Sequence, residues 1–254
     1  MDTLVLLHGF CEDSSVWAGL LPFLSSLPVQ CLDLPGFGQS PSPAQPTMSA
    51  YAEAIRQTLL AQGVSRCVLA GHSLGGYVTL EFASRWPDML AGVGLLHSHP
   101  YADTAERREA RDRGIALLRG GKKDAYVAEL FPGLFAKCYA ERLPEVVQKL
   151  IANGRQQSAE GIIAALEAMK ERPDHQDTLS GLACPALFVL GSEDSLIPVE
   201  DGLRAATLPD VAEVEVLEGV AHMGMFEAPQ EVAGVLKGFW ATCVGKTGTF
   251  VGGL

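Results

Sequence analysis

Short runs of apolar residues alternate along the chain with longer segments in which apolar residues recur at helical spacing. The apolar runs cover residues 3–7, 29–34, 66–70, 91–96, 186–190 and 212–217. The first five are almost continuously apolar, which is typical of strands buried on both faces of a parallel sheet. The sixth alternates between charged and apolar residues, so we expect it at an edge of the sheet.

Segments with helical periodicity separate most of these runs. They cover residues 14–25, 47–62, 74–86 and 226–244. A strand, a helix and a second strand form a right-handed crossover, and repeated crossovers give a parallel sheet with helices on its faces. The pattern therefore predicts an α/β fold with a doubly wound, parallel sheet of about six strands.

The alternation stops between His99 and Leu179. No run in that stretch resembles a strand, and helical patterns cover residues 103–118, 123–130, 144–152 and 158–170. A long helical insertion in such a sheet typically acts as a lid over the ligand crevice. We therefore predict a core formed by residues 1–98 and 179–244 and a helical cap formed by residues 99–178. Residues 245–254 are rich in glycine and predict a loose C-terminal tail.

Composition and charge exclude several classes of protein. The 254 residues include 19 Lys and Arg against 30 Asp and Glu, a formal net charge of −11. A nucleic-acid partner is excluded on that ground, because binding phosphates requires clustered cations. The chain is 48% hydrophobic and 19% charged, which excludes a disordered protein.

Membrane, leader and cysteine patterns point to the cytoplasm. The apolar runs fall far short of the roughly 18 residues that a spanning helix needs, and no basic leader is visible. The six cysteines show neither CxxC nor Cys/His zinc spacing, so we expect free thiols in a reducing compartment. We expect no membrane partner, no cofactor and no metal.

The clearest chemical motif is Gly71-His72-Ser73-Leu74-Gly75, which lies between a predicted strand and a predicted helix. This G-x-S-x-G pattern places a serine on a sharp turn, and its glycines remove Cβ atoms where strand and helix approach closely. The following helix also directs backbone amides toward a developing oxyanion. We predict Ser73 as a nucleophile; a glycine-rich turn with an incidental serine is the alternative.

A nucleophilic serine needs a base and an orienting carboxylate, and both should follow later strands of the sheet. Asp194 follows the run 186–190, and His222 follows the run 212–217. Glu193 is a competing carboxylate, but the turn favours Asp194. We therefore predict that Asp194 and His222 complete a triad with Ser73.

The first predicted strand ends in His8-Gly9-Phe10. Gly9 permits a turn that aims the next amide into the crevice. The amides of Phe10 and Leu74 are then candidates for an oxyanion hole. A strand-ending turn with a buried His8 is the alternative.

Together these motifs resemble the α/β-hydrolase superfamily. The resemblance also includes the loop 33–40, Gly191 and Ile197-Pro198 around Asp194, and Glu227-Ala228-Pro229 after His222. Within the superfamily the chain is similar to compact bacterial members with a helical cap, a group of esterases, C–C hydrolases, lactonases and perhydrolases. The chain departs from this family in two respects. Members usually carry two additional N-terminal strands, which we do not expect here, so the sheet should have six strands. Some relatives place the acid after the strand that corresponds to residues 91–96; this chain has His97-Ser98-His99 there, which favours Asp194.

Four residues are candidates for lining the substrate pocket: Trp17, His97, Phe131 and Phe135. Ordinary packing in the core is the alternative for each of them. His97 and His99 form an H-x-H pair, but no third metal ligand follows at a suitable spacing.

Four arginines follow at the start of the cap: Arg107, Arg108, Arg111 and Arg113. They fall among acidic residues at mixed helical angles. We therefore expect a solvated, salt-bridged face rather than a site for an acidic substrate.

These inferences predict a serine hydrolase that acts on small carboxylic esters or related acyl substrates through an acyl-enzyme. The expected partner is a small acyl molecule, and the expected state is a monomer or homodimer. Two alternatives use the same fold. The triad could serve C–C bond hydrolysis, elimination or acyl transfer, or the fold could act as a ligand receptor without catalysis.

Overall fold

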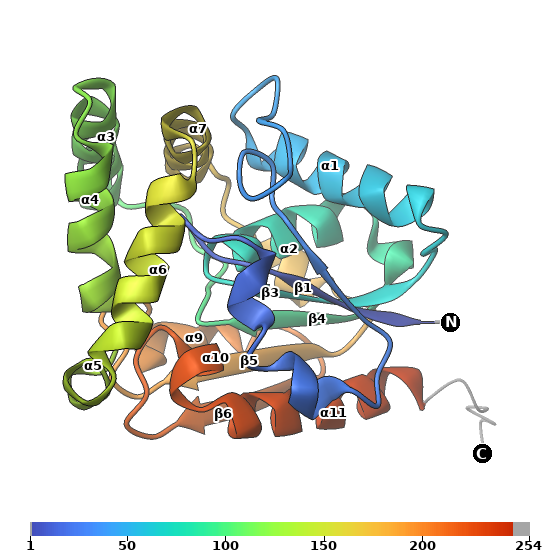
Figure 1. Ribbon diagram of the computed structural model, residues 1–254. Helices are drawn as coiled ribbons and strands as arrows, with labels where there is room; N and C mark the ends of the chain where they lie inside the picture. Colours follow the sequence, from blue (N-terminus) through green and yellow to red (C-terminus); the bar gives the residue numbers. More distant parts are fainter. Residues whose placement is uncertain (1, 246–254) are drawn as a thin grey trace, which may run out of the picture.

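A parallel sheet forms the centre of the protein, which we describe from a computed structural model covering residues 2–245 (Figure 1). Its order is β2-β1-β3-β4-β5-β6, and every neighbouring pair is parallel. The strands are β1 (Thr3–Leu7), β2 (Val29–Leu32), β3 (Cys67–His72), β4 (Leu90–Leu96), β5 (Ala186–Gly191) and β6 (Ala212–Leu217). The predicted fold class is therefore confirmed. Of the expected tail, residues 246–254 lie outside the described part.

Burial along each strand follows its place in the sheet. Strands β1, β3, β4 and β5 are buried throughout, as their apolar sequences predict. The alternating strand β6 lies at an edge, also as predicted. Strand β2 differs from the prediction, because it forms the opposite edge and pairs only with β1, which leaves Val29, Gln30 and Cys31 half-buried.

Helices cover both faces of the sheet. Helices α1 (Met48–Ala61) and α2 (Leu74–Arg85) pack on one face, and α11 (Pro229–Val244) covers the other (Figure 1). Shorter helices complete this core: η3 (Pro87–Met89), α8 (Gln176–Ser180), α9 (Val199–Ala205) and α10 (Gly224–Glu227). Among residues 2–245, none of the helices has the length and apolar character that crossing a bilayer requires.

Two predicted helices are broken by proline. Residues 14–25 form two 3₁₀ turns, η1 (Ser14–Trp17) and η2 (Leu21–Leu24), because Pro22 has no N–H to continue a helix from the preceding turn. Residues 226–244 divide between α10 and α11. Ala228, which precedes Pro229, has φ −141° and so leaves the helical region.

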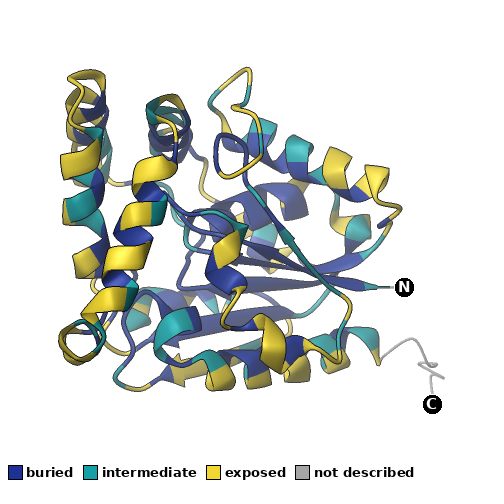
Figure 2. Cartoon of the chain, in the orientation of Figure 1, coloured by how far each residue is buried: buried dark blue, intermediate teal, exposed yellow. Residues whose placement is uncertain are grey.

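A helical segment lies between β4 and β5, beyond the carboxyl ends of the strands (Figure 1). It comprises α3 (Ala105–Arg119), α4 (Lys123–Leu130), η4 (Phe131–Leu134), α5 (Lys137–Arg142), α6 (Pro144–Gln156) and α7 (Ala159–Lys170), which we call the inserted helices. Helix α3 packs against α7, and α4 packs against α6. Their exposed residues lie on the outer faces, whereas the sheet beneath is buried (Figure 2).

Candidate active site

The turn between β3 and α2 holds Ser73 in a strained conformation. Its φ of 51° and ψ of −112° lie outside the regions that L-residues favour. A Cβ on Gly71 would lie 2.1 Å from the backbone of Gly75, so strand and helix can meet only because Gly71 lacks a side chain. A Cβ on Gly75 would lie 2.6 Å from Leu7 O at the end of β1. The Ser73 amide donates to Leu96 O (2.9 Å), and Ser98 Oγ donates to Ser73 O (2.9 Å). These bonds fix the turn to β4 and the residues that follow it.

Asp194 and His222 are in direct contact. His222 Nδ1 donates to Asp194 Oδ2 at 2.7 Å, while Asp194 Oδ1 accepts from the amides of Leu196 (2.9 Å) and Ile197 (3.0 Å). Burial alone would raise the pKa of the Asp194 carboxyl, but the charge and hydrogen bond of His222 outweigh burial and hold this pKa well below its ordinary value. The competing Glu193 is exposed.

The backbone around His222 is held from three sides. Its amide donates to Leu134 O of the inserted helices at 2.9 Å. The carboxylate of Glu227 accepts from the amides of Ala221 (3.2 Å) and Met223 (3.1 Å), the two neighbours of His222. On the third side, the carbonyl oxygen of His222 contacts His72 Nε2 at 2.9 Å. The imidazole of His222 is therefore presented by a rigid loop.

Ser73 and His222 line one cavity of about 230 Å³ beneath the inserted helices. Within residues 2–245 the Ser73 hydroxyl makes no hydrogen bond. Much of the remaining wall is apolar or aromatic: Tyr77, Ala110, Tyr126, Leu130, Leu134, Leu166, Met169, Leu196 and Ile197. The wall suits a small, partly apolar acyl group.

The two amides predicted for an oxyanion hole flank this cavity. Phe10 lines it, and Leu74 follows Ser73 at the start of α2. Neither amide donates a hydrogen bond to another of the described residues, so both donors are available to a ligand.

A buried ion pair that the sequence did not indicate lies beside these amides. Glu12 Oε2 accepts from the Gly9 amide at 2.8 Å and lies 3.4 Å from His72 Nδ1, with both side chains 1% exposed. Burial alone would lower the pKa of His72, but Glu12 raises it above its ordinary value. The same histidine lowers the pKa of Glu12 against the effect of burial. The pair therefore carries opposite charges and ties the loop of Gly9 to that of His222.

The predicted pocket residues need correction, because none of the four lines the cavity. Trp17 and Phe131 are fully buried in the hydrophobic core. Phe135 stacks on Tyr139 with ring centroids 5.5 Å apart. Large aromatic side chains gain more from close packing than from facing an open cavity. His97 lies against Asp194, with Nδ1 3.4 Å from Asp194 Oδ2.

His97 nevertheless belongs to the site. Burial lowers its pKa to about 4, and neither ring nitrogen makes a hydrogen bond within the described part of the chain. One ligand atom from each of His97, Asp194 and His222 lies within 4.8 Å of the others, a grouping that could hold a metal ion. His99, the other member of the H-x-H pair, faces away and contacts Arg107.

The four arginines of α3 divide into two kinds. Arg107 and Arg111 line the cavity. Arg108 pairs with Glu171 (3.4 Å), and Arg113 pairs with Glu109 (3.8 Å), all four with largely exposed side chains. The predicted solvated face is therefore correct for two arginines and wrong for the other two.

The sequence is similar to those of known proteins. The model of the alpha/beta hydrolase family matches residues 4–235. The chain is 29% identical over 248 residues to the biotin biosynthesis bifunctional protein BioHC of Cellvibrio japonicus, covering 94% of this chain but 47% of that protein, so it spans about half the length of this relative. It is 26% identical over 250 residues to a 2-hydroxy-6-oxononadienedioate/2-hydroxy-6-oxononatrienedioate hydrolase of Paraburkholderia phymatum, covering 94% and 86% of the two chains.

Solved structures agree with this assignment. A thermophilic esterase from Thermogutta terrifontis, with malate bound, matches with a TM-score of 0.91 and 29% identity, covering 96% of this chain and 90% of that chain. The six-stranded parallel sheet and the match of the family model over most of the chain lead to one conclusion. The chain belongs to the alpha/beta hydrolase family.

Proposed function

We propose that this protein is a serine hydrolase of small carboxylic esters or related acyl compounds. One observation carries the proposal: His222, held at 2.7 Å by Asp194, lines the same cavity as Ser73 on its strained turn. A nucleophile, a base and an orienting carboxylate from three separate loops thus converge at the carboxyl edge of the sheet, where ligands bind in such folds.

The acylation step follows from this arrangement. Ser73 Oγ attacks the ester carbonyl carbon while His222 Nε2 takes the hydroxyl proton, and Asp194 stabilises the imidazolium through Nδ1. The amides of Phe10 and Leu74 donate to the oxyanion of the tetrahedral intermediate. His222 then gives its proton to the leaving alcohol as the carbon–oxygen bond breaks.

Deacylation reverses the roles. His222 takes a proton from water, the hydroxide attacks the acyl carbon, and the tetrahedral intermediate collapses to the free acid. Ser73 Oγ recovers the proton from His222, so the enzyme returns to its starting state.

The surrounding organisation is part of the proposal. Residues 99–178 act as a cap over a core of residues 1–98 and 179–244, and the partner is a small acyl molecule. We place the protein in the cytoplasm as a monomer or homodimer. We expect the cysteines to remain thiols in that reducing compartment.

A second candidate is C–C bond hydrolysis of an oxo acid by the same residues. The likeness to the Paraburkholderia phymatum oxononadienedioate hydrolase favours it. The test is product analysis with a 2-hydroxy-6-oxo diene acid. Cleavage of that compound at a rate above that of simple esters would replace the first candidate with the second.

The test of the main proposal is steady-state hydrolysis of p-nitrophenyl esters from acetyl to dodecanoyl. We expect saturable turnover that Ser73→Ala abolishes and that Ser26→Ala, which removes an exposed serine hydroxyl, leaves intact. Circular dichroism confirms that each variant is folded. Hydrolysis that persists in Ser73→Ala, or a folded wild type that turns over none of the esters, would overturn the proposal.

A further inference from the structure

We propose that Arg107 and Arg111 form an anion subsite, and that the preferred acyl group carries a carboxylate at its far end. The inference deepens the proposed function and rests on it for the position of the reacting carbonyl. Both arginines line the cavity that contains Ser73. A small acyl group bound in about 230 Å³ can therefore meet the nucleophile and the guanidinium groups together.

Arg107 has partners, but none of them is an anion. Its Nη1 lies 2.8 Å from His99 Nε2, and its Nη2 donates to Leu196 O at 2.8 Å. Burial and the charges of nearby arginines hold His99 in its neutral form, with a pKa of about 3. Within residues 2–245, no carboxylate lies at ion-pair distance from Arg107. Its positive charge is therefore uncompensated at the cavity wall.

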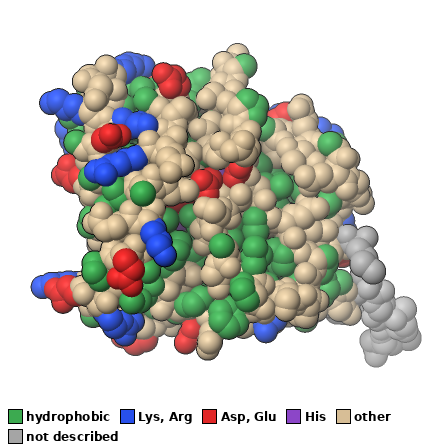
Figure 3. Space-filling view, viewed as in Figure 1, with side chains coloured by type: hydrophobic (Ala, Val, Ile, Leu, Met, Phe, Trp, Pro, Cys, Tyr) green, Lys and Arg blue, Asp and Glu red, His purple; other side chains and the backbone are tan. Residues whose placement is uncertain are grey.

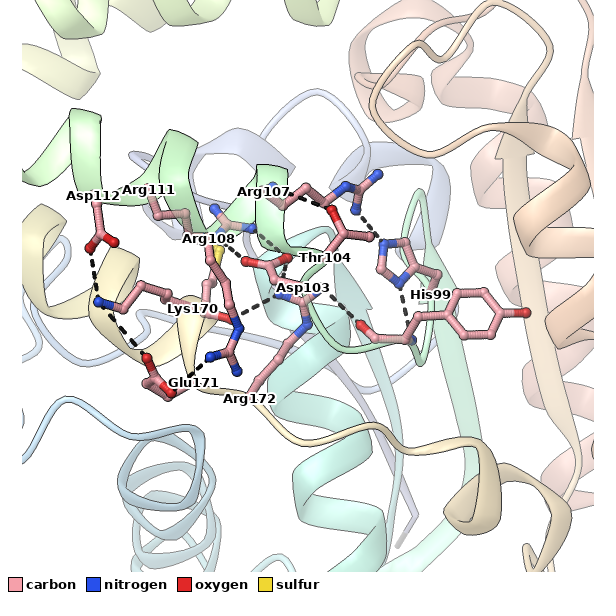
Figure 4. Close-up of polar contacts among 12 residues, drawn as sticks. His99, Asp103, Thr104, Arg107, Arg108, Arg111, Asp112, Lys170, Glu171 and Arg172 are labelled. Atoms are coloured by element: carbon pink, nitrogen blue, oxygen red, sulfur yellow. Dashed lines mark hydrogen bonds and ion pairs between the residues drawn. The ribbon is translucent and has the colours of Figure 1, made fainter.

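Asp103, the nearby carboxylate, is already occupied. Arg111 Nε donates to its Oδ2 at 2.5 Å, and Arg172 Nη1 donates to its Oδ1 at 2.6 Å. Figure 4 shows Arg111 and Arg172 converging on Asp103, while Arg107 reaches the other way toward His99. Two guanidinium groups thus share the one carboxylate and Arg107 has none, so three cations stand against one anion, a local excess of two positive charges.

Other charged groups near the cavity do not cancel this excess. Glu12 is neutralised by His72, its partner in the buried ion pair. Lys170 pairs with Asp112 (2.8 Å), and Arg108 pairs with Glu171 (Figure 4). None of these four residues lines the cavity. The excess charge therefore lies at and beside the cavity wall, where Arg107 and Arg111 line it.

The charges of the chain as a whole are also unevenly distributed between the segment 99–178 and the rest. Residues 99–178 contain 13 of the 19 Lys and Arg and 13 of the 30 Asp and Glu, so 13 − 13 leaves this segment neutral, and 6 − 17 leaves the rest of the chain at −11. In one view, Lys and Arg side chains gather over the inserted helices (Figure 3). An anionic ligand is therefore repelled less by residues 99–178 than by the rest of the chain.

A carboxylate is the anion that this wall fits. Guanidinium groups bind carboxylates through paired hydrogen bonds, and a cation without a counter-charge in an apolar cavity is costly until an anion joins it. The apolar wall between the two ends suits a methylene chain. The substrate class is therefore a half-ester of a short dicarboxylic acid.

The experiment compares matched esters in a pH-stat. Monomethyl succinate, glutarate and adipate are paired with methyl butyrate, valerate and hexanoate, which differ by a carboxylate in place of the terminal methyl group. We expect the wild type to favour the charged member of at least one pair in kcat/KM. Arg107→Gln should lower that ratio by about 10- to 100-fold, the range for one hydrogen bond to a charged group.

The matched control is Arg113→Gln on the outer face of α3, where the arginine side chain is 68% exposed. It should leave the ratio of the two rate constants at the wild-type value. A wild type that favours the neutral esters, or an Arg107→Gln ratio equal to that of the wild type, would overturn the inference while leaving the hydrolase proposal in place.

If neither kind of ester is turned over, binding measurements distinguish the anion-subsite proposal from the hydrolase proposal. Calorimetric titration with glutarate and with neutral glutaramide then tests the subsite alone. Glutarate binding that disappears in Arg107→Gln supports the subsite even though the hydrolase proposal has failed. Equal binding of the two compounds, unchanged binding in the variant, or no binding of glutarate overturns the subsite.

Discussion

Replacing Asp194 with Asn tests how the base is oriented. In the structure Asp194 Oδ1 accepts two backbone amides, those of Leu196 and Ile197, and Oδ2 faces His222 Nδ1. An asparagine must keep its oxygen toward the two amide donors, because its NH₂ group would otherwise meet them donor to donor. The NH₂ group then faces Nδ1 and makes that nitrogen an acceptor. The imidazole is forced into the tautomer that carries its proton on Nε2.

This tautomer cannot take a proton from Ser73. It also loses the negative charge that stabilises the imidazolium formed during acylation. We expect kcat to fall about 10⁴-fold, which corresponds to about 5.4 kcal/mol at roughly 1.36 kcal/mol for each factor of ten. The residual rate should come from the oxyanion-hole amides and from substrate binding alone.

The assay is steady-state hydrolysis of p-nitrophenyl acetate, with thermal unfolding measured to show that the variant is folded. Glu193→Gln is the matched control, since it removes the adjacent carboxylate, which is exposed and makes no contact with His222. It should keep the wild-type rate. An Asp194→Asn enzyme that retains a tenth or more of kcat would refute this account of the base.

The structure predicts the effects of three further substitutions. Gly71→Ala places a Cβ 2.1 Å from the backbone of Gly75, so the free energy of unfolding in urea should fall by more than about 3 kcal/mol. Burial lowers the pKa of His97 from 6.5 to about 4. The stability that depends on the neutral imidazole is therefore complete above pH 6.5 and is lost as the pH falls toward 4. His97→Gln should make Tm less sensitive to acid between these two pH values. The pKa of His72 is raised by Glu12, so the stability from this pair is full below pH 6.5 and is lost as pH rises through the higher value. Glu12→Gln should lower the free energy of unfolding at pH 6 by about 3 kcal/mol and flatten the decline of Tm at alkaline pH.

Each of these outcomes can fail in a recognisable way. A Gly71→Ala variant with wild-type stability would mean that strand and helix can separate at no cost. Parallel curves of Tm against pH for wild type and His97→Gln would show that another group causes the acid sensitivity. An unchanged alkaline decline in Glu12→Gln would show that the buried pair is not charged.

The sheet, and the meeting of Ser73, Asp194 and His222 at its edge, were predictable because each depends on local pattern. A strand covered on both faces must be apolar throughout, so β1, β3, β4 and β5 stand out in the sequence. The turn at Ser73 needs glycine on both sides for steric reasons, which leaves a motif that can be read directly. The strands then fix which loops meet, and this places Asp194 and His222 near Ser73 without knowledge of any distance.

The cavity wall was not predictable in the same way, because it depends on how the inserted helices pack. Phe131 and Phe135 were natural candidates as aromatic residues in this segment, yet they pack in its interior. The pair of Glu12 with His72 joins residues 60 positions apart (72 − 12). No sequence motif contains both residues, so their contact could be found only in the folded structure.

The arginines of α3 did leave a signal in the sequence. Residues four apart on a helix share a face, so Arg107 and Arg111 continue the line of Ile115, which is 5% exposed, with Leu118 close beside it at 3%. An arginine on the same helix face as buried apolar residues points toward the interior. Arg113 lies on the opposite side of the helix and points to solvent. The acidic neighbours in sequence suggest that all of these arginines are solvated. Their positions on the helix instead predict that Arg107 and Arg111 face inward. Inward-facing cations without a full set of carboxylate partners require a ligand to supply the missing charge, and this is the basis for expecting an anionic substrate.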